Sequence, residues 1–277
     1  MNHSAQPELL LSARISVRYG DKPPVLRDAE FEIRRGEVLG LVGQSGSGKS
    51  TLAMAILGLL DRKRTHADGA IQFDGSDLLK LGERDLRALR GRKIALVLQS
   101  PLSSLNPALK IRTQLKEAWR AHASGPAPDY DRAIRSALES VSLPSSDEFL
   151  QKHPSQMSVG QAQRVLIAMA VMHRPALLIA DEATSALDVI TQSEILALFR
   201  ELNRSFGMAI LYISHDLASV AGICDRIAIL HQGEIVETGT TEQVLTRPQH
   251  EYTQRLMAAM PKMPQPQRLA AGKAAAL

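Results

Sequence analysis

The chain has 277 residues, of which 44% are hydrophobic and 22% are charged, and its formal net charge at pH 7 is +4. These fractions are typical of a globular protein and exclude a wholly disordered chain. The length suits one large domain or two modest ones. A net charge of +4 over this length is too mild to indicate nucleic-acid binding.

Neither a membrane-spanning segment nor an export signal is expected. The longest apolar run, Val165 to Met172, is far shorter than the about 18 residues that a spanning helix needs. Met1 to Glu8 lack a basic region followed by an apolar core. The single cysteine, Cys224, leaves no internal disulfide or cysteine metal site, which fits a reducing compartment. The composition therefore predicts a soluble, cytosolic chain.

The first forty residues have the patterns of β-strands. Residues 13–19 alternate apolar and polar side chains, as a half-buried strand does. Strands are expected at 31–33 and 38–42, joined by a turn in which Gly36 supplies a positive φ. The second of these strands is continuously apolar, which predicts burial on both faces of a sheet.

Further along, strands and helices alternate. After a glycine-rich loop we expect a helix over 50–60, and more strands at 70–73, 94–98, 177–180, 209–213 and 227–230. The turn Gln232-Gly233 predicts a hairpin with a strand at 235–237.

Residues 101 to about 160 have a helical pattern instead. Ile134, Leu138 and Val141 follow helical spacing, with breaks at 125–128 and at Leu143-Pro144. An amphipathic helix is expected over 188–206, and a disordered tail after Met260. The chain is therefore predicted to be an α/β core with a helical insert.

A phosphate-binding loop runs from Gly43 to Thr51. The segment GQSGSGKST matches G-x-x-x-x-G-K-[ST], between a buried strand and a helix. Glycines let backbone N–H groups point at phosphates, and the helix N-terminus adds partial positive charge. Lys49 would reach the β- and γ-phosphates, and the Ser50 hydroxyl would bind Mg²⁺. The predicted nucleotide contacts are Gly43, Gln44, Ser45, Gly46, Ser47, Gly48, Lys49, Ser50 and Thr51.

Two acids end the apolar strand at 177–180. In a nucleotide site, Asp181 would hold Mg²⁺ and Glu182 would polarise the attacking water. Acids at strand ends are also common in ordinary loops. The combination with the phosphate-binding loop is what indicates an NTPase.

With these motifs the chain resembles the ATP-binding-cassette (ABC) ATPases over residues 9–260. Gln99 matches the family's Q-loop glutamine, and residues 157–161 (MSVGQ) fall where the family has its L-S-G-G-Q signature. Residues 185–188 (SALD) match the D-loop. His215 matches the switch histidine, and Tyr19 matches the aromatic that stacks on adenine.

Each match also has an ordinary structural interpretation. Gln99 suits a strand end, Tyr19 suits a sheet edge, and residues 214–216 suit the cap of a following helix. The order and spacing of the whole set favour the resemblance.

The resemblance implies an α/β fold, a P-loop NTPase (RecA-like) core of ABC-ATPase type with an antiparallel β portion and a helical subdomain. It implies core residues 9–100 and 161–248, a helical subdomain at 101–160 that ends with the signature, and a C-terminal element at 249–277. The catalytic residues would be Glu182, His215 and Gln99, and the Mg²⁺ ligands Ser50, Gln99 and Asp181. Further ATP contacts would come from Tyr19, Asp188, Ser158, Gly160 and Gln161.

In this family two cassettes sandwich two ATP molecules, and each signature faces the nucleotide of the other subunit. The chain departs from the family pattern at three positions, Met157, Val159 and Ala183. Val159 places a β-branched side chain where glycine normally lets the backbone approach phosphate. We therefore expect the composite site that this signature completes to be weakened.

Two segments narrow the resemblance to importers of dipeptides, oligopeptides and nickel. Residues 99–107 (QSPLSSLNP) resemble the segment after the Q-loop in that group, and 250–256 (HEYTQRL) resemble its H-P-Y-T-x-x-L element. This implies an ATP-hydrolysing importer subunit, peripheral on the cytoplasmic face of the inner (plasma) membrane. Its cargo would be peptides, nickel, a metallophore or an opine, and the short tail favours the last three over oligopeptides.

The implied partners are a second ABC ATPase subunit, as a heterodimer or a homodimer, two integral membrane permeases and, indirectly, an extracytoplasmic solute-binding protein. No nucleic-acid partner is expected. Because Cys224 is the only cysteine, the iron–sulfur cluster of some group members is not expected.

Three other classes of P-loop protein are alternatives to an importer subunit. The strongest is an ABC-type ATPase in a soluble enzyme complex such as carbon–phosphorus lyase. An ABC-type ATPase of nucleic acid or translation usually has two cassettes or long coiled-coil insertions. A simple P-loop kinase would not need the signature, the D-loop and the switch histidine.

Overall fold

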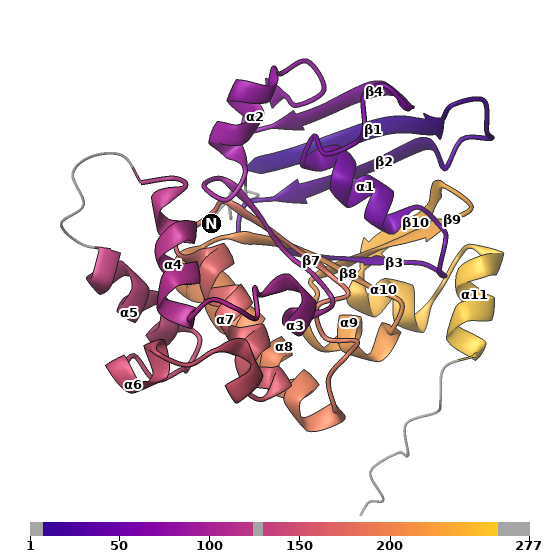
Figure 1. Ribbon diagram of the computed structural model, residues 1–277. Coiled ribbons are helices and arrows are strands. Elements are labelled where there is room, and N and C mark those ends of the chain that lie inside the picture. Colours follow the sequence, from indigo (N-terminus) through magenta and orange to yellow (C-terminus); the bar gives the residue numbers. More distant parts are fainter. Residues whose placement is uncertain (1–7, 124–129, 260–277) are drawn as a thin grey trace, which may run out of the picture.

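The computed structural model describes residues 8–123 and 130–259, which form two β-sheets and the helices around them (Figure 1). The break predicted at 125–128 and the tail predicted after Met260 lie outside these residues. Within the described ranges, no helix is both long enough and apolar enough to span a bilayer.

The larger sheet has six strands in the order β10-β9-β3-β8-β7-β6. The neighbouring pairs among β9, β3, β8, β7 and β6 are parallel, and β10 runs antiparallel to β9. The strands are β3 (Val38–Val42), β6 (Ile94–Val97), β7 (Leu177–Asp181), β8 (Ala209–Ser214), β9 (Arg226–His231) and β10 (Glu234–Thr240). The turn between β9 and β10 has the positive φ angles, 48° at Gln232 and 89° at Gly233, that the predicted hairpin requires.

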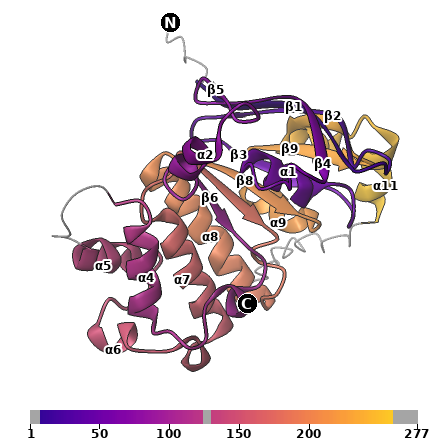
Figure 2. The ribbon, with the colours of Figure 1, turned by 45° about the horizontal axis from the view of Figure 1, so that its top comes forward.

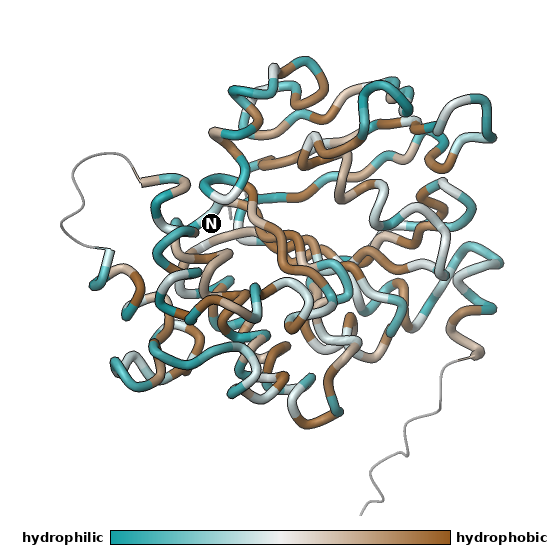
Figure 3. Tube along the Cα trace, viewed as in Figure 1, coloured by the Kyte–Doolittle hydropathy of each residue, from teal (hydrophilic) through white to brown (hydrophobic). Residues whose placement is uncertain are grey.

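The central strand β3 is buried along its whole length, as its apolar run predicts. Val38 and Val42 belong to one hydrophobic core, while Leu39 and Leu41 belong to a second core on the opposite face. Alternate side chains of β3 therefore separate two cores. In Figure 3 the central strands form a hydrophobic band through the molecule.

The smaller sheet is antiparallel, with the order β2-β1-β4-β5. Its strands are β1 (Leu9–Tyr19), β2 (Leu26–Arg34), β4 (Thr65–Phe73) and β5 (Ser76–Asp77). Helix α1 (Lys49–Ile56) packs into the core that this sheet shares with the larger one. The helix ends four residues before the predicted end, because Gly58 adopts a left-handed φ of 61° just after it. Helix α2 (Glu83–Leu89) follows β5.

A group of helices covers the other face of the larger sheet (Figure 2). It comprises α3 (Pro101–Ser104), α4 (Ile111–Arg120), α5 (Tyr130–Ser140), α6 (Asp147–Leu150), the 3₁₀ turn Pro154–Gln156, α7 (Val159–Val171) and α8 (Val189–Phe206). Helix α7 contacts α3, α4 and α5 as well as β6, so it joins the helical insert to the sheet. The chain continues through α9 (Leu217–Ile223), α10 (Thr241–Thr246) and α11 (Glu251–Ala258).

The packing of α9 on β3 predicts the effect of adding a methyl group at Gly40. A Cβ there would lie 2.5 Å from Val220 Cγ1 and 2.9 Å from Cys224 Sγ. We therefore expect Gly40→Ala to destabilise the fold by about 1–3 kcal/mol, the usual cost of overpacking a core.

The matched control is Gly222→Ala in α9, where an added Cβ meets no atom within 4 Å. Alanine is the better helix former, so this variant is expected to be neutral or stabilising. Denaturant unfolding of both variants measures the difference. Equal stabilities would contradict this account of the β3–α9 contact.

Candidate nucleotide-binding site

The candidate residues lie along one edge of the larger sheet. Because β3, β6, β7 and β8 are parallel, their carboxyl ends meet at the same edge, where open α/β sheets bind ligands. The phosphate-binding loop follows β3, and Gln99 follows β6. Glu182 follows β7, and His215 follows β8.

The phosphate-binding loop is held by its own lysine. The buried Lys49 Nζ donates to the carbonyl oxygens of Gly43 at 2.8 Å and of Gln44 at 3.0 Å. Burial lowers the pKa of the Lys49 ammonium group, while the nearby Glu182 and Asp181 carboxylates oppose that shift. The ammonium group therefore lies inside the loop and within electrostatic reach of both acids.

Gly43 is required by close contact between the loop and β9. A Cβ at this position would lie 2.3 Å from the Leu230 carbonyl oxygen, which is backbone and cannot rotate away. At the other end of the loop, Gly48 has a φ of 110° where α1 begins, a conformation that L side chains rarely adopt. The two glycines therefore fix the path of the loop from the sheet into the helix.

Asp181 has the properties of a carboxylate that needs a cation. It is the last residue of β7 and only 8% exposed, and its Oδ1 atom has no hydrogen-bond partner among the described residues. Burial raises the pKa of this carboxyl group. A buried oxygen left without a partner costs free energy, and a bound cation would recover it.

Glu182 and His215 form a pair across the ends of β7 and β8. Glu182 has a φ of 49°, unusual for a residue with a side chain, and its N–H donates to the Ile213 carbonyl at 3.0 Å. His215 Nδ1 lies 3.3 Å from Glu182 Oε1. The His215 side chain is 58% exposed and the Glu182 side chain is 24% exposed, so both remain accessible to a ligand.

A cavity of about 410 Å³ lies between the phosphate-binding loop, Glu182 and His215. It is lined by Gly43, Gln44, Ser45, Glu182, His215 and Leu256. The structure therefore brings together the phosphate-binding loop, the acid after β7 and the histidine after β8, as their spacing predicts. Leu256 is not one of the predicted site residues. The segment that contains it, 250–256, was noted only for its resemblance to the H-P-Y-T-x-x-L element.

Tyr19 and Gln99 lie at the periphery. Tyr19 ends β1, and its hydroxyl oxygen lies 3.5 Å from Thr51 Oγ1 in α1, so its ring is beside the phosphate-binding helix. Gln99 is exposed in the loop after β6. The strand ends at Val97, one residue before the predicted end at Leu98. It is not among the described residues that line the cavity.

The signature segment begins helix α7. Ser158 is its N-cap, and Ser158 Oγ accepts from the Gln161 N–H at 3.2 Å. Gln161 Oε1 in turn accepts from the Ser158 N–H at 3.2 Å, which completes a capping box. Val159 is 39% exposed in the first turn. None of the described residues lining the cavity comes from this segment.

The first turn of α8, which follows the D-loop, is packed against the signature segment. Asp188 caps α8 by accepting from the N–H groups of Ile190 and Thr191, and the Thr191 hydroxyl also donates to Asp188 Oδ2 at 2.7 Å. A Cβ at Gly160 would lie 2.8 Å from Thr191 Cγ2. Glycine at 160 therefore allows the starts of α7 and α8 to touch.

The predicted capping role of residues 214–216 is also real. Asp216 is the N-cap of α9 and accepts from the N–H groups of Ala218 and Ser219. Because Asp216 performs the capping, the His215 side chain is left to face Glu182. The cap predicted for this segment is therefore made by Asp216, and the switch role of His215 stays a prediction.

A parallel sheet that gathers a phosphate-binding loop, a buried acidic strand end and a histidine at one edge defines the class of P-loop nucleoside triphosphatases. The sequence pattern of the ABC transporter family matches residues 26–185, and that of the oligopeptide/dipeptide transporter C-terminal region matches residues 236–276. The chain belongs to the ABC transporter family and carries its ATPase cassette, with the predicted fold class.

The chain is also similar in sequence to known transport ATP-binding proteins. The dipeptide transport ATP-binding protein DppD of Haemophilus influenzae is 40% identical over 257 residues, covering 92% of this chain and 78% of the relative. The peptidoglycan transport ATP-binding protein YejF of Agrobacterium fabrum is 45% identical over 258 residues, 91% of this chain. The match covers 47% of YejF, so the chain spans about half the length of that relative.

The fold also matches a solved cassette. The dimeric ATP-binding cassette MJ0796, in a post-hydrolysis state with ADP and Pi, is 26% identical with a TM-score of 0.71. The match covers 84% of this chain and 98% of that one. The sequence-based expectation of an ABC ATPase is confirmed.

Proposed function

We propose that the chain is the ATP-hydrolysing subunit of an ABC importer that takes up peptides through separate permease subunits. The observation that carries the proposal is the cavity in which the phosphate-binding loop meets Glu182 and His215. The match of residues 236–276 to the oligopeptide/dipeptide transporter C-terminal region, and the name of the DppD relative, support the peptide cargo.

The residues present fit ATP with Mg²⁺. Asp181 Oδ1 and Ser47 Oγ are buried and have no hydrogen-bond partner among the described residues, as expected of groups that await a ligand. Asp181, Ser50 and Gln99 would hold the ion, and Lys49 would pair with the phosphates. The ion supplies positive charge that offsets the charge developing on the phosphates.

Glu182 and His215 are proposed to act on the attacking water. Glu182 would accept its proton, because this side chain is partly exposed at the cavity rather than committed to a buried ion pair. His215, 3.3 Å away, would hold the carboxylate and contact the γ-phosphate. Tyr19, beside α1, would stack on the adenine.

A second cassette subunit is proposed to complete the site. The N-terminus of α7 has the partial positive charge that favours a phosphate, but its residues do not line the chain's own cavity. Ser158, Gly160, Gln161 and Asp188 would therefore serve a nucleotide on the partner. The dimeric state of the MJ0796 relative supports this arrangement. A heterodimer is favoured, with a homodimer as the other outcome.

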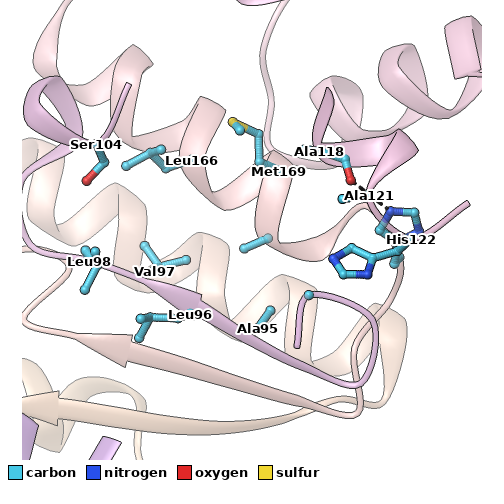
Figure 4. A pocket seen from close by; sticks show the side chains of 13 residues that line it. Ala95, Leu96, Val97, Leu98, Ser104, Ala118, Ala121, His122, Leu166 and Met169 are labelled. Carbon is cyan, nitrogen blue, oxygen red and sulfur yellow. Dashed lines mark hydrogen bonds between the residues drawn. The ribbon is translucent and has the colours of Figure 1, made fainter. Parts of the chain in front are cut away.

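The permease is proposed to dock where the helical subdomain, residues 101–160, meets β6 and α7. A groove of about 260 Å³ opens between β6, α4 and α7 and is lined by apolar side chains that include Leu96, Leu166 and Met169 (Figure 4). Leu98, at its edge, is 41% exposed and immediately precedes Gln99. A segment bound there would contact the loop that holds a proposed Mg²⁺ ligand.

The cargo and the location follow from the same proposal. Peptides are favoured over nickel, a metallophore or an opine, because the DppD relative is named for dipeptide transport. The chain would be peripheral on the cytoplasmic face of the membrane, with an extracytoplasmic solute-binding protein as an indirect partner. A soluble complex such as carbon–phosphorus lyase is the less supported alternative.

Co-purification separates transport from a soluble complex. When the chain is expressed with its neighbouring genes, detergent extracts should yield it with two permease subunits. Proteoliposomes of that complex, supplied with the solute-binding protein outside, should take up a labelled dipeptide only when ATP is enclosed inside. Deleting the permease genes should abolish uptake. Recovery of the tagged chain only in a membrane-free enzyme complex would overturn the importer proposal.

Replacing Glu182 with glutamine tests the catalytic assignment. Glu182→Gln removes the proton acceptor but keeps the side-chain shape, so the assembled complex should bind ATP and lose steady-state hydrolysis by about 100-fold or more. The trapped ATP should be retained through gel filtration. Glu201→Gln, the same change at an exposed residue of α8, is the control and should hydrolyse ATP at the wild-type rate. Hydrolysis at the wild-type rate by Glu182→Gln would refute the role of Glu182.

Val159 tests whether the signature is weakened. In the first turn of α7, Val159→Gly removes the branched side chain from the end that would face the partner's nucleotide. We expect the ATPase rate of the assembled complex, or its ATP affinity, to rise about threefold, which corresponds to less than ~1 kcal/mol. Val159→Ala, which keeps helix propensity, should give part of the gain. If rate and affinity both stay unchanged, the side chain has no such effect.

A further inference from the structure

Helix α11 is fastened to the β9–β10 hairpin by several specific contacts. The Glu237 carboxylate on β10 accepts from the N–H groups of Gln249 and His250 at 2.8 and 3.0 Å. His250 Nδ1 then accepts from the Tyr252 N–H, so His250 caps the helix. The Tyr252 ring stacks on His231, with ring centroids 3.7 Å apart and an interplanar angle of 19°.

The same hairpin contacts the phosphate-binding loop. The Leu230 carbonyl is the atom against which Gly43 packs, and His231 is the next residue along β9. The aromatic stack therefore holds α11 next to the strand end that supports the loop. In Figure 1, α11 lies beside β9 and β10, at the end of the molecule opposite the helical subdomain.

Leu256 lies one helical turn beyond Tyr252 and therefore on the same face of α11. Its side chain is half-buried and lines the cavity that contains Glu182 and His215. Among the six described lining residues it is the only aliphatic one. A helix remote in sequence from the nucleotide motifs thus supplies an apolar wall to the catalytic cavity.

We propose that Leu256 is a positioning residue for ATP hydrolysis. As an apolar lining residue it would limit the water that enters beside Glu182 and His215, and it would keep the His215 ring within 3.3 Å of the Glu182 carboxylate. Fewer waters around this pair strengthen its electrostatic interactions, because the local dielectric falls. The proposal rests on the roles proposed above for Glu182 and His215.

A residue with this role should affect the rate of ATP turnover more than the affinity for the nucleotide. Leu256 lies with the loop residues Gly43 to Ser45 and the catalytic pair, whereas Tyr19, the proposed adenine contact, is not among the described residues of this cavity. Shortening Leu256 should therefore disorder the water and the Glu182–His215 pair while leaving most contacts of the nucleotide in place. Misplacement of reacting groups lowers rate more than affinity.

The test compares variants of α11 in the full chain, assembled with its partner subunits. Leu256→Ala should lower kcat for Mg-ATP about tenfold and change KM by less than about twofold. Leu256→Gln, of similar length but polar, should also lower kcat, because it admits water. Leu256→Met, an apolar side chain of similar volume, should restore kcat to within about twofold of the wild type.

The matched control is Met257→Ala, which removes a half-buried apolar side chain from the same helix without changing the cavity lining. It should keep kcat near the wild-type value. Wild-type kcat in both Leu256→Ala and Leu256→Gln would overturn the proposal, and so would an equal loss in Met257→Ala. If Glu182→Gln also hydrolysed ATP normally, the catalytic role proposed for Glu182, on which this proposal rests, would fail instead.

Discussion

The arrangement of the site depends on the burial of β3 between two hydrophobic cores. Val38 and Val42 pack into the core beneath the helices, and Leu39 and Leu41 pack into the core shared with the antiparallel sheet. A strand fixed on both faces cannot shift its register without exposing one set of side chains. The loop at its end is therefore held against β9, where Gly43 meets the Leu230 carbonyl. The acids after β7 and the histidine after β8 are placed by strands paired to this one.

The central part of this arrangement could be predicted from sequence for a simple reason. Parallel strands end at the same edge, so Lys49, Glu182 and His215 had to converge once their strands were identified. Turn positions could also be predicted, because Gly36 and Gly233 adopt the positive φ that their residue type allows. Local chemistry and strand direction were sufficient in these cases.

Other features depend on packing that no local pattern reveals. The left-handed backbone of Glu182 occurs at a residue with a side chain, so composition gives no hint of it. The role of Leu256 depends on a carboxylate at 237 and on a stack between His231 and Tyr252, which are distant in sequence. The 250–256 segment was visible as a marker of one group within the family. Its position beside the cavity could be found only in three dimensions.

The contact between Gly160 and Thr191 has a mechanical consequence. The first turns of α7 and α8 touch there with no room for a Cβ, and each turn is stiffened by its own cap, Ser158 in one and Asp188 in the other. We therefore expect the two capped helix ends to move as one rigid unit. Because Thr191 contacts Gly160 and is hydrogen-bonded to Asp188, a displacement of the start of α7 toward α8 is expected to displace Asp188 as well.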